Sequence, residues 1–422
     1  MEASENDGGR ARALPARSSL GGGREERAVR RVTTVGRGAK LPSEPGRAPL
    51  RVALIHDWLT GMRGGERCLE VFCELFPEAD LFTLLHVAGS VTPVIERRRI
   101  VTSFIQRLPV VATRYRYYLP LFPAAVESFD LRGYDLVLSS SHCVAKGARP
   151  APGVPHVSYC FTPMRYVWDR YDDYFGRGAG LLTRTLMPPV AARLRRWDRA
   201  SSDRVDRFAA ISRHVAARID RYYGRTAEVI YPPVDVRRFE VATGDDDGFY
   251  LVVSALVPYK RLDLAVQAAH LLDRRLLVVG GGPEERSLRA LAGSRVEFLG
   301  RRSDEEVAEL YRRCRAVLFP GLEDFGIVPL EAMAAGRPVI AFAAGGALET
   351  IVAPGEERSP TGVFFHAQTV DALADAMRRL EGGGVVFDPK ALRARAEEFD
   401  RARFKDRVAS FIGSALAGPI RC

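Results

Sequence analysis

The sequence lacks any apolar run near the roughly 18 residues that a membrane-spanning helix needs. No apolar segment typical of a secretory signal stands near its start. Its six cysteines show neither CxxC nor any other zinc-ligand spacing. We therefore interpret them as reduced thiols and predict a cytoplasmic protein without a metal site.

Lysine is also scarce, so the formal net charge of +10 comes almost entirely from arginine. Such a charge permits attraction to nucleotide diphosphates, to anionic lipid or to nucleic acid. No nucleic-acid-binding motif accompanies the charge, and we expect no nucleic-acid partner. A GC-rich genome explains an excess of arginine equally well.

The sequence does contain enough apolar residues, 47% of 422, to build two globular domains. Residues 1–49 show no hydrophobic periodicity and are rich in Gly, Arg, Ser and Pro, so we predict a disordered basic tail. The acidic run Gly244–Gly248 is interpreted as a solvated linker. The predicted units are the tail 1–49, a first domain 50–243, a second domain 244–395 and a helical segment 396–422.

Apolar segments of strand length alternate with helical segments along both predicted domains. This alternation indicates an α/β fold with doubly wound parallel sheets. Ligands bind to such sheets beyond the carboxyl ends of the strands. The predicted strands span residues 50–56, 80–84, 135–139, 157–160, 208–211, 249–254, 276–279, 296–300, 316–319, 338–342 and 362–365.

The most informative stretch is 319–350. It leaves a predicted strand, passes through a loop that carries Glu323, and enters a helix predicted over 328–335. Backbone N–H groups of Phe325–Ile327 point out of the N-terminus of that helix, where anions and hydroxyls bind. Glu331 lies one turn further on among apolar residues, where a carboxylate is tolerable if it accepts hydrogen bonds, for example from a vicinal diol.

Taken alone, the two glutamates are more simply interpreted as a solvated loop acid and a residue that favours the helix dipole. The context changes this interpretation. The segment 323–339, EDFGIVPLEAMAAGRPV, followed by Gly345, Gly346 and Glu349, resembles the E-x7-E element of the family 4 retaining glycosyltransferases. The resemblance extends from Leu50 to about Ile412. It implies the GT-B fold, in which two Rossmann-like domains face each other across a cleft and the C-terminal helices return to the first domain.

The resemblance also implies roles for particular residues. Glu331 is expected to hold the ribose diol of a nucleotide sugar, while Glu323 orients donor hydroxyls. Lys260 is expected to meet the donor diphosphate, and a glycine pair between the first strand and the first helix is expected to face it. The residues assigned to donor binding are Gly64, Gly65, Lys260, Arg261, Phe325, Gly326, Ile327 and Glu331.

One position departs from the family pattern. The family usually has an arginine five residues before the diphosphate lysine, where this chain has Ala255. Arg261 is the proposed substitute, because a guanidinium binds phosphate oxygens with a fork of donors. The same departure keeps open a protein that binds nucleotide sugars without transferring them.

His142 follows the predicted strand 135–139, at a position similar to the active-site histidine of the family. We therefore predict that His142 and Glu323 are the catalytic residues, with a structural histidine as the alternative for His142. Arg165 and Tyr166 lie in a segment that resembles the acceptor side of bacterial mannosyltransferase-like members. Aromatic faces and arginines suit sugars and phosphates, although such a cluster is equally typical of a core. His56 is interpreted as structural.

The resemblance implies a hexosyltransferase that moves a hexosyl group from a nucleoside-diphosphate sugar to a hydroxyl of a glycan or lipid-linked acceptor. GDP-mannose is the guessed donor, and no cofactor and no metal are expected. A sugar-nucleotide epimerase on the same fold, or an inactive nucleotide-sugar-binding protein, are the alternatives. An arginine-rich amphipathic helix predicted over 181–206 suits either peripheral contact with the inner face of the membrane or a cover for the sheet, and the cover is favoured.

Overall fold

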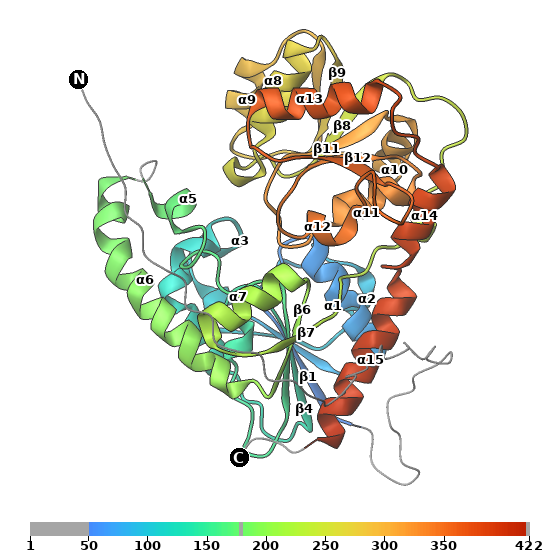
Figure 1. The fold of residues 1–422 in the computed structure, drawn as a ribbon. Coiled ribbons are helices and arrows are strands. Elements are labelled where there is room, and N and C mark those ends of the chain that lie inside the picture. The colour runs from blue at the N-terminus through green and yellow to red at the C-terminus, as the bar shows by residue number, and fades with distance from the viewer. Residues whose placement is uncertain (1–49, 177–179, 419–422) are drawn as a thin grey trace, which may run out of the picture. The chain divides into compact units, whose positions relative to one another are not determined.

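The computed structural model describes residues 50–176 and 180–418. The predicted tail, 1–49, lies outside the described residues. Two wholly parallel sheets, one in each predicted domain, form the framework, and helices pack against both (Figure 1). The α/β fold class expected from the alternation is confirmed. Parallel strands need long crossover connections, and the helices between successive strands supply them.

The first sheet has seven strands in the order β3-β2-β1-β4-β5-β6-β7. Its central strands are buried on both faces: Val52 and Leu54 of β1 belong to one apolar core, and Ala53 and Ile55 to another. The strands are β1 Val52–His56, β2 Asp80–Thr83, β3 Ile100–Thr102, β4 Leu136–Ser141, β5 His156–Cys160, β6 Arg207–Ala210 and β7 Ala227–Val229.

The second sheet has six strands in the order β10-β9-β8-β11-β12-β13. Its central strands are also buried on both faces, as expected for parallel strands covered by helices. The strands are β8 Phe249–Val253, β9 Arg275–Val279, β10 Val296–Gly300, β11 Ala316–Phe319, β12 Val339–Phe342 and β13 Gly362–Phe365.

Fifteen α-helices are found in the described ranges. The helix predicted over 328–335 starts and ends one residue earlier, because Gly326 precedes its first turn as the N-cap residue. The bounds are α1 Gly64–Leu75, α2 Pro93–Glu96, α3 Val111–Arg114, α4 Phe122–Glu127, α5 Tyr171–Phe175, α6 Leu181–Ser201, α7 Arg213–Tyr223, α8 Leu262–Leu271, α9 Glu285–Leu291, α10 Asp304–Arg313, α11 Ile327–Ala334, α12 Ala347–Thr350, α13 Val370–Glu381, α14 Pro389–Glu397 and α15 Arg401–Ala417.

The strand order reverses once in each sheet, between β1 and β4 in the first and between β8 and β11 in the second. At such a reversal the connections leave toward opposite faces, which opens a crevice beyond the carboxyl ends of the two strands. The loops after β1 and β4 carry Asp57 and His142, and those after β8 and β11 carry Lys260 and Glu323. The topology therefore sets these four side chains at the reversal points of the two sheets.

The last helix packs on the first domain. The Phe404 ring of α15 lies 5.9 Å from that of Phe72 in α1 and 5.5 Å from that of Tyr159 in β5. Arg401 of the same helix forms an ion pair with Glu74 at 2.7 Å. In Figure 1, α15 is red and runs beside the blue α1.

The arginine-rich helix α6 covers the first sheet. Ala191 and Leu194 are buried in its apolar core, and Trp197 donates a hydrogen bond from Nε1 to Glu127 at 2.7 Å. Much of the apolar face of this helix is therefore occupied by the protein itself, as the favoured interpretation expected. Within 50–176 and 180–418, no helix is both long and apolar enough to cross a membrane.

Candidate active site

A buried aspartate fixes the loop that carries His142. Asp57 follows β1 directly and is fully buried. Its carboxylate accepts the backbone N–H groups of four successive residues of the loop after β4, at distances between 2.7 and 3.0 Å, and these residues are His142, Cys143, Val144 and Ala145. Four amides converging on one carboxylate make a strong clamp, because hydrogen bonds to a charged acceptor are stronger than neutral ones.

The same carboxylate orients the imidazole. The Nδ1 atom of His142 lies 3.0 Å from Asp57, and its ring packs edge-on against Trp58 with centroids 4.4 Å apart. Burial alone would raise the pKa of Asp57, but the charge and hydrogen bonds of His142 hold that pKa well below its usual range. A hydrogen bond at Nδ1 leaves Nε2 as the ring nitrogen that faces other partners.

His56 lies beside this arrangement. It is 1% exposed, its Nδ1 lies 2.8 Å from Ser140 Oγ, and its Nε2 lies 3.7 Å from a carboxylate oxygen of Glu66. No residue in the described part of the chain forms a hydrogen bond with that Nε2. Both His56 and Glu66 line the main cavity described below, so the histidine that the sequence suggested was structural stands next to the candidate site.

Gly64 lies where the first domain closely approaches α11 of the second. Gly64 and Gly65 open α1, and a Cβ added at Gly64 would lie 2.9 Å from the Cδ1 atom of Ile327 in α11. Real Cβ atoms do not approach so closely, so a larger residue at position 64 would require the end of the Ile327 side chain to shift. Gly64 thus faces the second domain directly, whereas Gly65 packs against Phe161 and His56 of the first domain.

On the second sheet, Lys260 and Glu323 form an ion pair. Their loops can meet because Gly321 packs against the backbone of Lys260, where an added Cβ would lie 2.9 Å from its Cα. Burial lowers the pKa of Lys260 to about 7, and the charges of Arg165 and Arg170 act in the same direction. The charge of Asp324 acts in the opposite direction and raises the pKa of this lysine.

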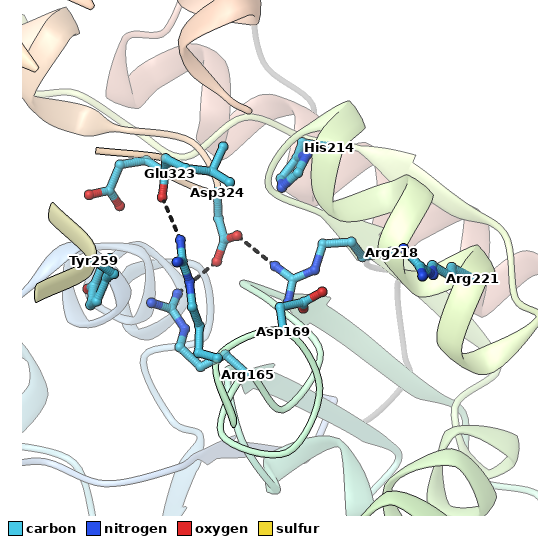
Figure 2. Close-up of a pocket in the computed structure, with 10 residues that line it drawn as sticks. Arg165, Asp169, His214, Arg218, Arg221, Tyr259, Glu323 and Asp324 are labelled. Carbon is cyan, nitrogen blue, oxygen red and sulfur yellow. Dashed lines mark hydrogen bonds and ion pairs between the residues drawn. The ribbon is translucent and has the colours of Figure 1, made fainter. Parts of the chain in front are cut away.

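Asp324, next to Glu323, joins the two domains. It accepts Arg165 Nη2 and Arg218 Nη1, each at 2.7 Å (Figure 2). Burial alone would raise the pKa of Asp324, but these two guanidinium groups outweigh burial and lower it. The second of the tentative acceptor-side residues, Tyr166, is buried and packs on Tyr174, with ring centroids 4.8 Å apart.

The N-terminus of α11 is held by the turn after β12. Gly326 takes a positive φ of 86°, and the Phe325 ring stacks on Tyr231 with centroids 5.6 Å apart. Gly346 lies so close to the backbone of Phe325 that no Cβ would fit there. The amide groups of Phe325–Ile327 are thereby fixed in position at the start of a helix, where the dipole favours negative charge.

Two predicted donor residues lie elsewhere. Glu331 accepts a hydrogen bond from the hydroxyl of Tyr311 at 3.0 Å, and burial raises the pKa of its carboxyl group. Arg261 has a positive φ of 51° and pairs with Asp263 at 3.0 Å. Neither Glu331 nor Arg261 is among the described residues that line the main cavity. Arg301, at the end of β10, does line it, and no feature of the sequence indicated this.

The remaining predicted residues meet at one cavity of about 870 Å³, which is within the usual range for ligand sites. Both sheets contribute to its wall. Among the residues that line it are His142, Gly64, Gly65, Arg165, Tyr166, Lys260, Glu323, Phe325, Gly326 and Ile327, together with His56, Glu66, Ala255 and Arg301. We call this space the main cavity.

The residues that line the main cavity indicate which kinds of ligand, metal ions included, it suits. No group of three or more His, Cys, Asp or Glu suited to a metal ion occurs among residues 50–176 and 180–418. Cationic and polar donors line the main cavity instead and suit a negatively charged group, and these are Arg63, Arg116, Arg165, Lys260, Arg301 and the α11 amides. Metal independence nevertheless stays a prediction that only an assay tests.

Comparison with solved structures defines the class of fold. A structure of the Anabaena protein HepE in complex with UDP superposes with a TM-score of 0.64 at 18% identity, covering 86% of this chain and 100% of that one. A sucrose-phosphate synthase from Thermosynechococcus elongatus gives the same TM-score at 19% identity, covering 87% of this chain and 99% of that one. With the two parallel sheets described above, this likeness establishes the GT-B architecture.

Sequence comparison then supplies the family. Residues 62–238 match the model described as Glycosyltransferase Family 4, and residues 234–399 match the model described as Glycosyl transferases group 1. The chain belongs to the family 4 glycosyltransferases of the GT-B fold, as the motif around Glu323 suggested.

Curated relatives are matched over part of their length. The D-inositol 3-phosphate glycosyltransferase of Mycobacteroides abscessus is 30% identical, over 51% of this chain and 51% of the relative. A GDP-mannose-dependent phosphatidylinositol monomannoside mannosyltransferase of Mycobacterium tuberculosis is 31% identical, over 46% of this chain and 57% of the relative. The chain spans about half the length of the curated relatives it matches.

Proposed function

We propose that this protein is an active hexosyltransferase that transfers a sugar, with retention of anomeric configuration, from a nucleoside-diphosphate sugar to an acceptor hydroxyl. The observation that carries the proposal is the main cavity, in which His142 of one domain and Lys260 and Glu323 of the other line the same space. A transferase needs such a space, because donor and acceptor must meet there with water largely excluded.

The chemistry of the wall suits this reaction. The bond between the anomeric carbon and the diphosphate oxygen breaks, the acceptor oxygen bonds to that carbon, and the acceptor proton passes to the leaving diphosphate or to solvent. Negative charge grows on the diphosphate as the bond breaks. Lys260, the α11 amides and the Gly64-Gly65 turn are the proposed groups that stabilise it, which is the usual way in which fixed donors and charges lower a barrier.

His142 is the proposed positioning group for the sugar. Because Asp57 holds Nδ1, the Nε2 atom is the side of the ring that is oriented for a sugar hydroxyl. Glu323 is proposed to accept other hydroxyls of the donor sugar while it remains paired with Lys260. Glu331 keeps its proposed role at the ribose diol although it does not line the main cavity, and Tyr311 supplies one hydrogen bond to its carboxylate.

GDP-mannose is the proposed donor, and a glycan or lipid-linked hydroxyl is the proposed acceptor. The name of the M. tuberculosis relative, which is GDP-mannose-dependent, supports that donor. The HepE structures, which contain UDP, make UDP-sugars the competing class. Nothing in the cavity wall discriminates between the bases, so the experiment decides between them.

The inactive nucleotide-sugar-binding protein is the second candidate, and Ala255 favours it. Ala255 lines the main cavity where the family usually has an arginine, and Arg261, the substitute suggested by the sequence, is paired with Asp263 instead. Arg301 lines the same cavity and is the cation that we propose as the replacement. Activity in the wild type that is lost in Arg301→Gln would favour the enzyme.

A two-stage experiment tests the proposal. GDP-, UDP- and ADP-sugars are first screened by thermal shift, where a ligand at 100 times its dissociation constant adds about 2.7 kcal/mol to the stability. Release of nucleoside diphosphate from the best donor is then measured with and without candidate acceptors, in the presence of a chelator. Binding without release, in wild type and under every acceptor condition, would contradict the proposal and favour the inactive binding protein.

A further inference from the structure

A second, smaller cavity lies against the main one. Its volume is about 210 Å³, and side chains from the segment after β5, from α7 and from the loops of the second domain converge on it (Figure 2). We call it the arginine pocket. It is lined by Arg165, Asp169, Arg170, His214, Arg218, Arg221, Tyr259, Leu322, Glu323 and Asp324.

The arginine pocket carries an excess of positive charge. Four arginines face three carboxylates, which leaves one positive charge in excess with His214 neutral. Lys260, which pairs with Glu323, adds a further positive charge. The local excess, with Lys260 included, is therefore two positive charges. A pocket with a net positive charge attracts an anion, since low-dielectric walls concentrate the field.

Two arginines of this pocket have N–H groups that could donate to a ligand. The Nε–H of Arg218 is buried, and within the described ranges it has no hydrogen-bond partner, although the other nitrogens of that guanidinium bind Asp324 and Asp169. A buried donor without an acceptor is uncommon and calls for a bound group. Arg221 is exposed and lies over the ring of Tyr222 at 5.6 Å, and no described carboxylate pairs with it.

The position of the arginine pocket beside the proposed donor site indicates which ligand it binds. Arg165, Tyr259, Glu323 and Asp324 line both cavities, so a group in the arginine pocket lies next to the main cavity. Lys260 and the Gly64-Gly65 turn, the groups proposed for the donor diphosphate, line only the main cavity. A second anion at this place therefore belongs to the other substrate.

We propose that the arginine pocket binds a phosphate group carried by the acceptor, and this proposal rests on the proposed transferase function. Guanidinium forks match the oxygens of a phosphate, and a doubly charged phosphate balances the local excess of two charges. A volume of about 210 Å³ suits one such group rather than a whole nucleotide sugar. The phosphate is attached either to a lipid or to a soluble sugar, and the chemistry of recognition is the same.

Binding of inorganic phosphate to the full-length protein, measured by calorimetry, tests the pocket directly. Arg221→Gln should lower the affinity about tenfold, the loss expected for one charge-assisted hydrogen bond. Arg213→Gln is the matched control, because Arg213 lies on the same helix but does not line the pocket. Arg301→Gln removes a cation that lines only the main cavity, and Arg221→Lys should restore part of the affinity.

The outcomes are distinct. A loss confined to Arg221→Gln supports the proposal. A loss confined to Arg301→Gln would place the phosphate in the main cavity, and equal affinity in all variants would mean that the arginines form only a structural ion-pair network; either result overturns the proposal. If phosphate binds with the expected pattern but the protein transfers no sugar, the proposed transferase function is wrong. The phosphate-binding role of the arginine pocket is then still supported.

Vesicles distinguish the two sources of phosphate. Sedimentation with phosphatidylcholine vesicles containing phosphatidic acid is compared with pure phosphatidylcholine. Arg221→Gln and Arg213→Gln have the same net charge, so general attraction to the anionic surface is equal in both. Vesicle binding weakened only in Arg221→Gln indicates a lipid-linked acceptor. Phosphate binding that depends on Arg221, without such an effect on vesicles, indicates a soluble sugar phosphate, and both results support the pocket.

Discussion

The two walls of the main cavity are held by different forces. In the first domain, the loop that carries His142 is fixed by backbone amides that converge on the buried carboxylate of Asp57. In the second domain, Lys260 and Glu323 are long side chains that hold each other, and Asp324 is held by arginines from the first domain.

The difference has a physical consequence. The clamp around Asp57 is complete without a ligand, so it can keep an imidazole in one orientation before substrate arrives. The ion pairs opposite can be exchanged, because a diphosphate can replace Glu323 as the partner of Lys260 and a sugar hydroxyl can replace Lys260 as the partner of Glu323. The wall that must bind charge therefore consists of charges that are paired with each other until a ligand separates them.

The largest effect is expected when the clamp is removed. Asp57→Ala should lower the free energy of unfolding by about 3–5 kcal/mol, because it removes a buried charge and leaves four loop amides without an acceptor. Denaturant unfolding measures this loss. Asp57→Asn is the control, since its one oxygen still serves some of these amides, and it should lose clearly less. An Asp57→Ala protein with wild-type stability would show that the loop is held by other contacts.

The second prediction separates function from stability at His142. His142→Ala should cut turnover about 10²-fold, the range for a positioning or proton-transfer group. Its free energy of unfolding should change by no more than about 1 kcal/mol, because Asp57 retains its amide partners. Turnover per folded molecule and the unfolding curve are measured on the same samples. A destabilised variant with full activity per folded molecule would remove His142 from the site.

The third prediction compares the two glutamates of the second domain. Glu331→Gln should weaken binding of the free nucleoside diphosphate and of the whole donor equally, by roughly 1–3 kcal/mol. Glu323→Gln should spare the diphosphate and impair transfer. Tyr311→Phe is a matched control, because it removes only the hydrogen bond to Glu331. Equal losses of diphosphate affinity in both glutamate variants would contradict the two roles.

The smallest effect is a pH dependence at Lys260. Burial, with help from Arg165, lowers the pKa of this lysine to about 7, whereas a bound diphosphate requires the charged form. As the pH rises above that value, the free protein loses the proton and binding must take it up again. Affinity for the diphosphate should therefore fall with rising pH, by at most about tenfold per unit.

Calorimetry near pH 8, in two buffers of different ionisation enthalpy, detects the proton taken up on binding. Lys260→Arg should bind without this uptake, because arginine stays charged throughout the range. An affinity that is independent of pH in the wild type would mean that Glu323 keeps Lys260 fully charged before the ligand arrives.

Much of the fold was predictable because its signals are local. Buried parallel strands appear in sequence as short apolar runs, and Gly and Pro mark their ends, so the unit from β11 through α11 to β12 was placed to within one or two residues. The short edge strands β3 and β7 were not predicted, since three residues with partial exposure give no periodicity. The motif around Glu323 identified the family because its spacing is specific.

The sequence by itself thus determined the two-domain α/β fold, the family and the loops on which the candidate residues lie. Tertiary structure alone decided which side chains face one another. Asp57 is 85 residues from His142 in the chain and meets it only because β1 and β4 are neighbours in the sheet. Arg261 was expected at the diphosphate, but its left-handed backbone directs it to Asp263. The arginine pocket likewise needs residues from both domains. Such contacts depend on packing between distant segments, which local periodicity does not encode.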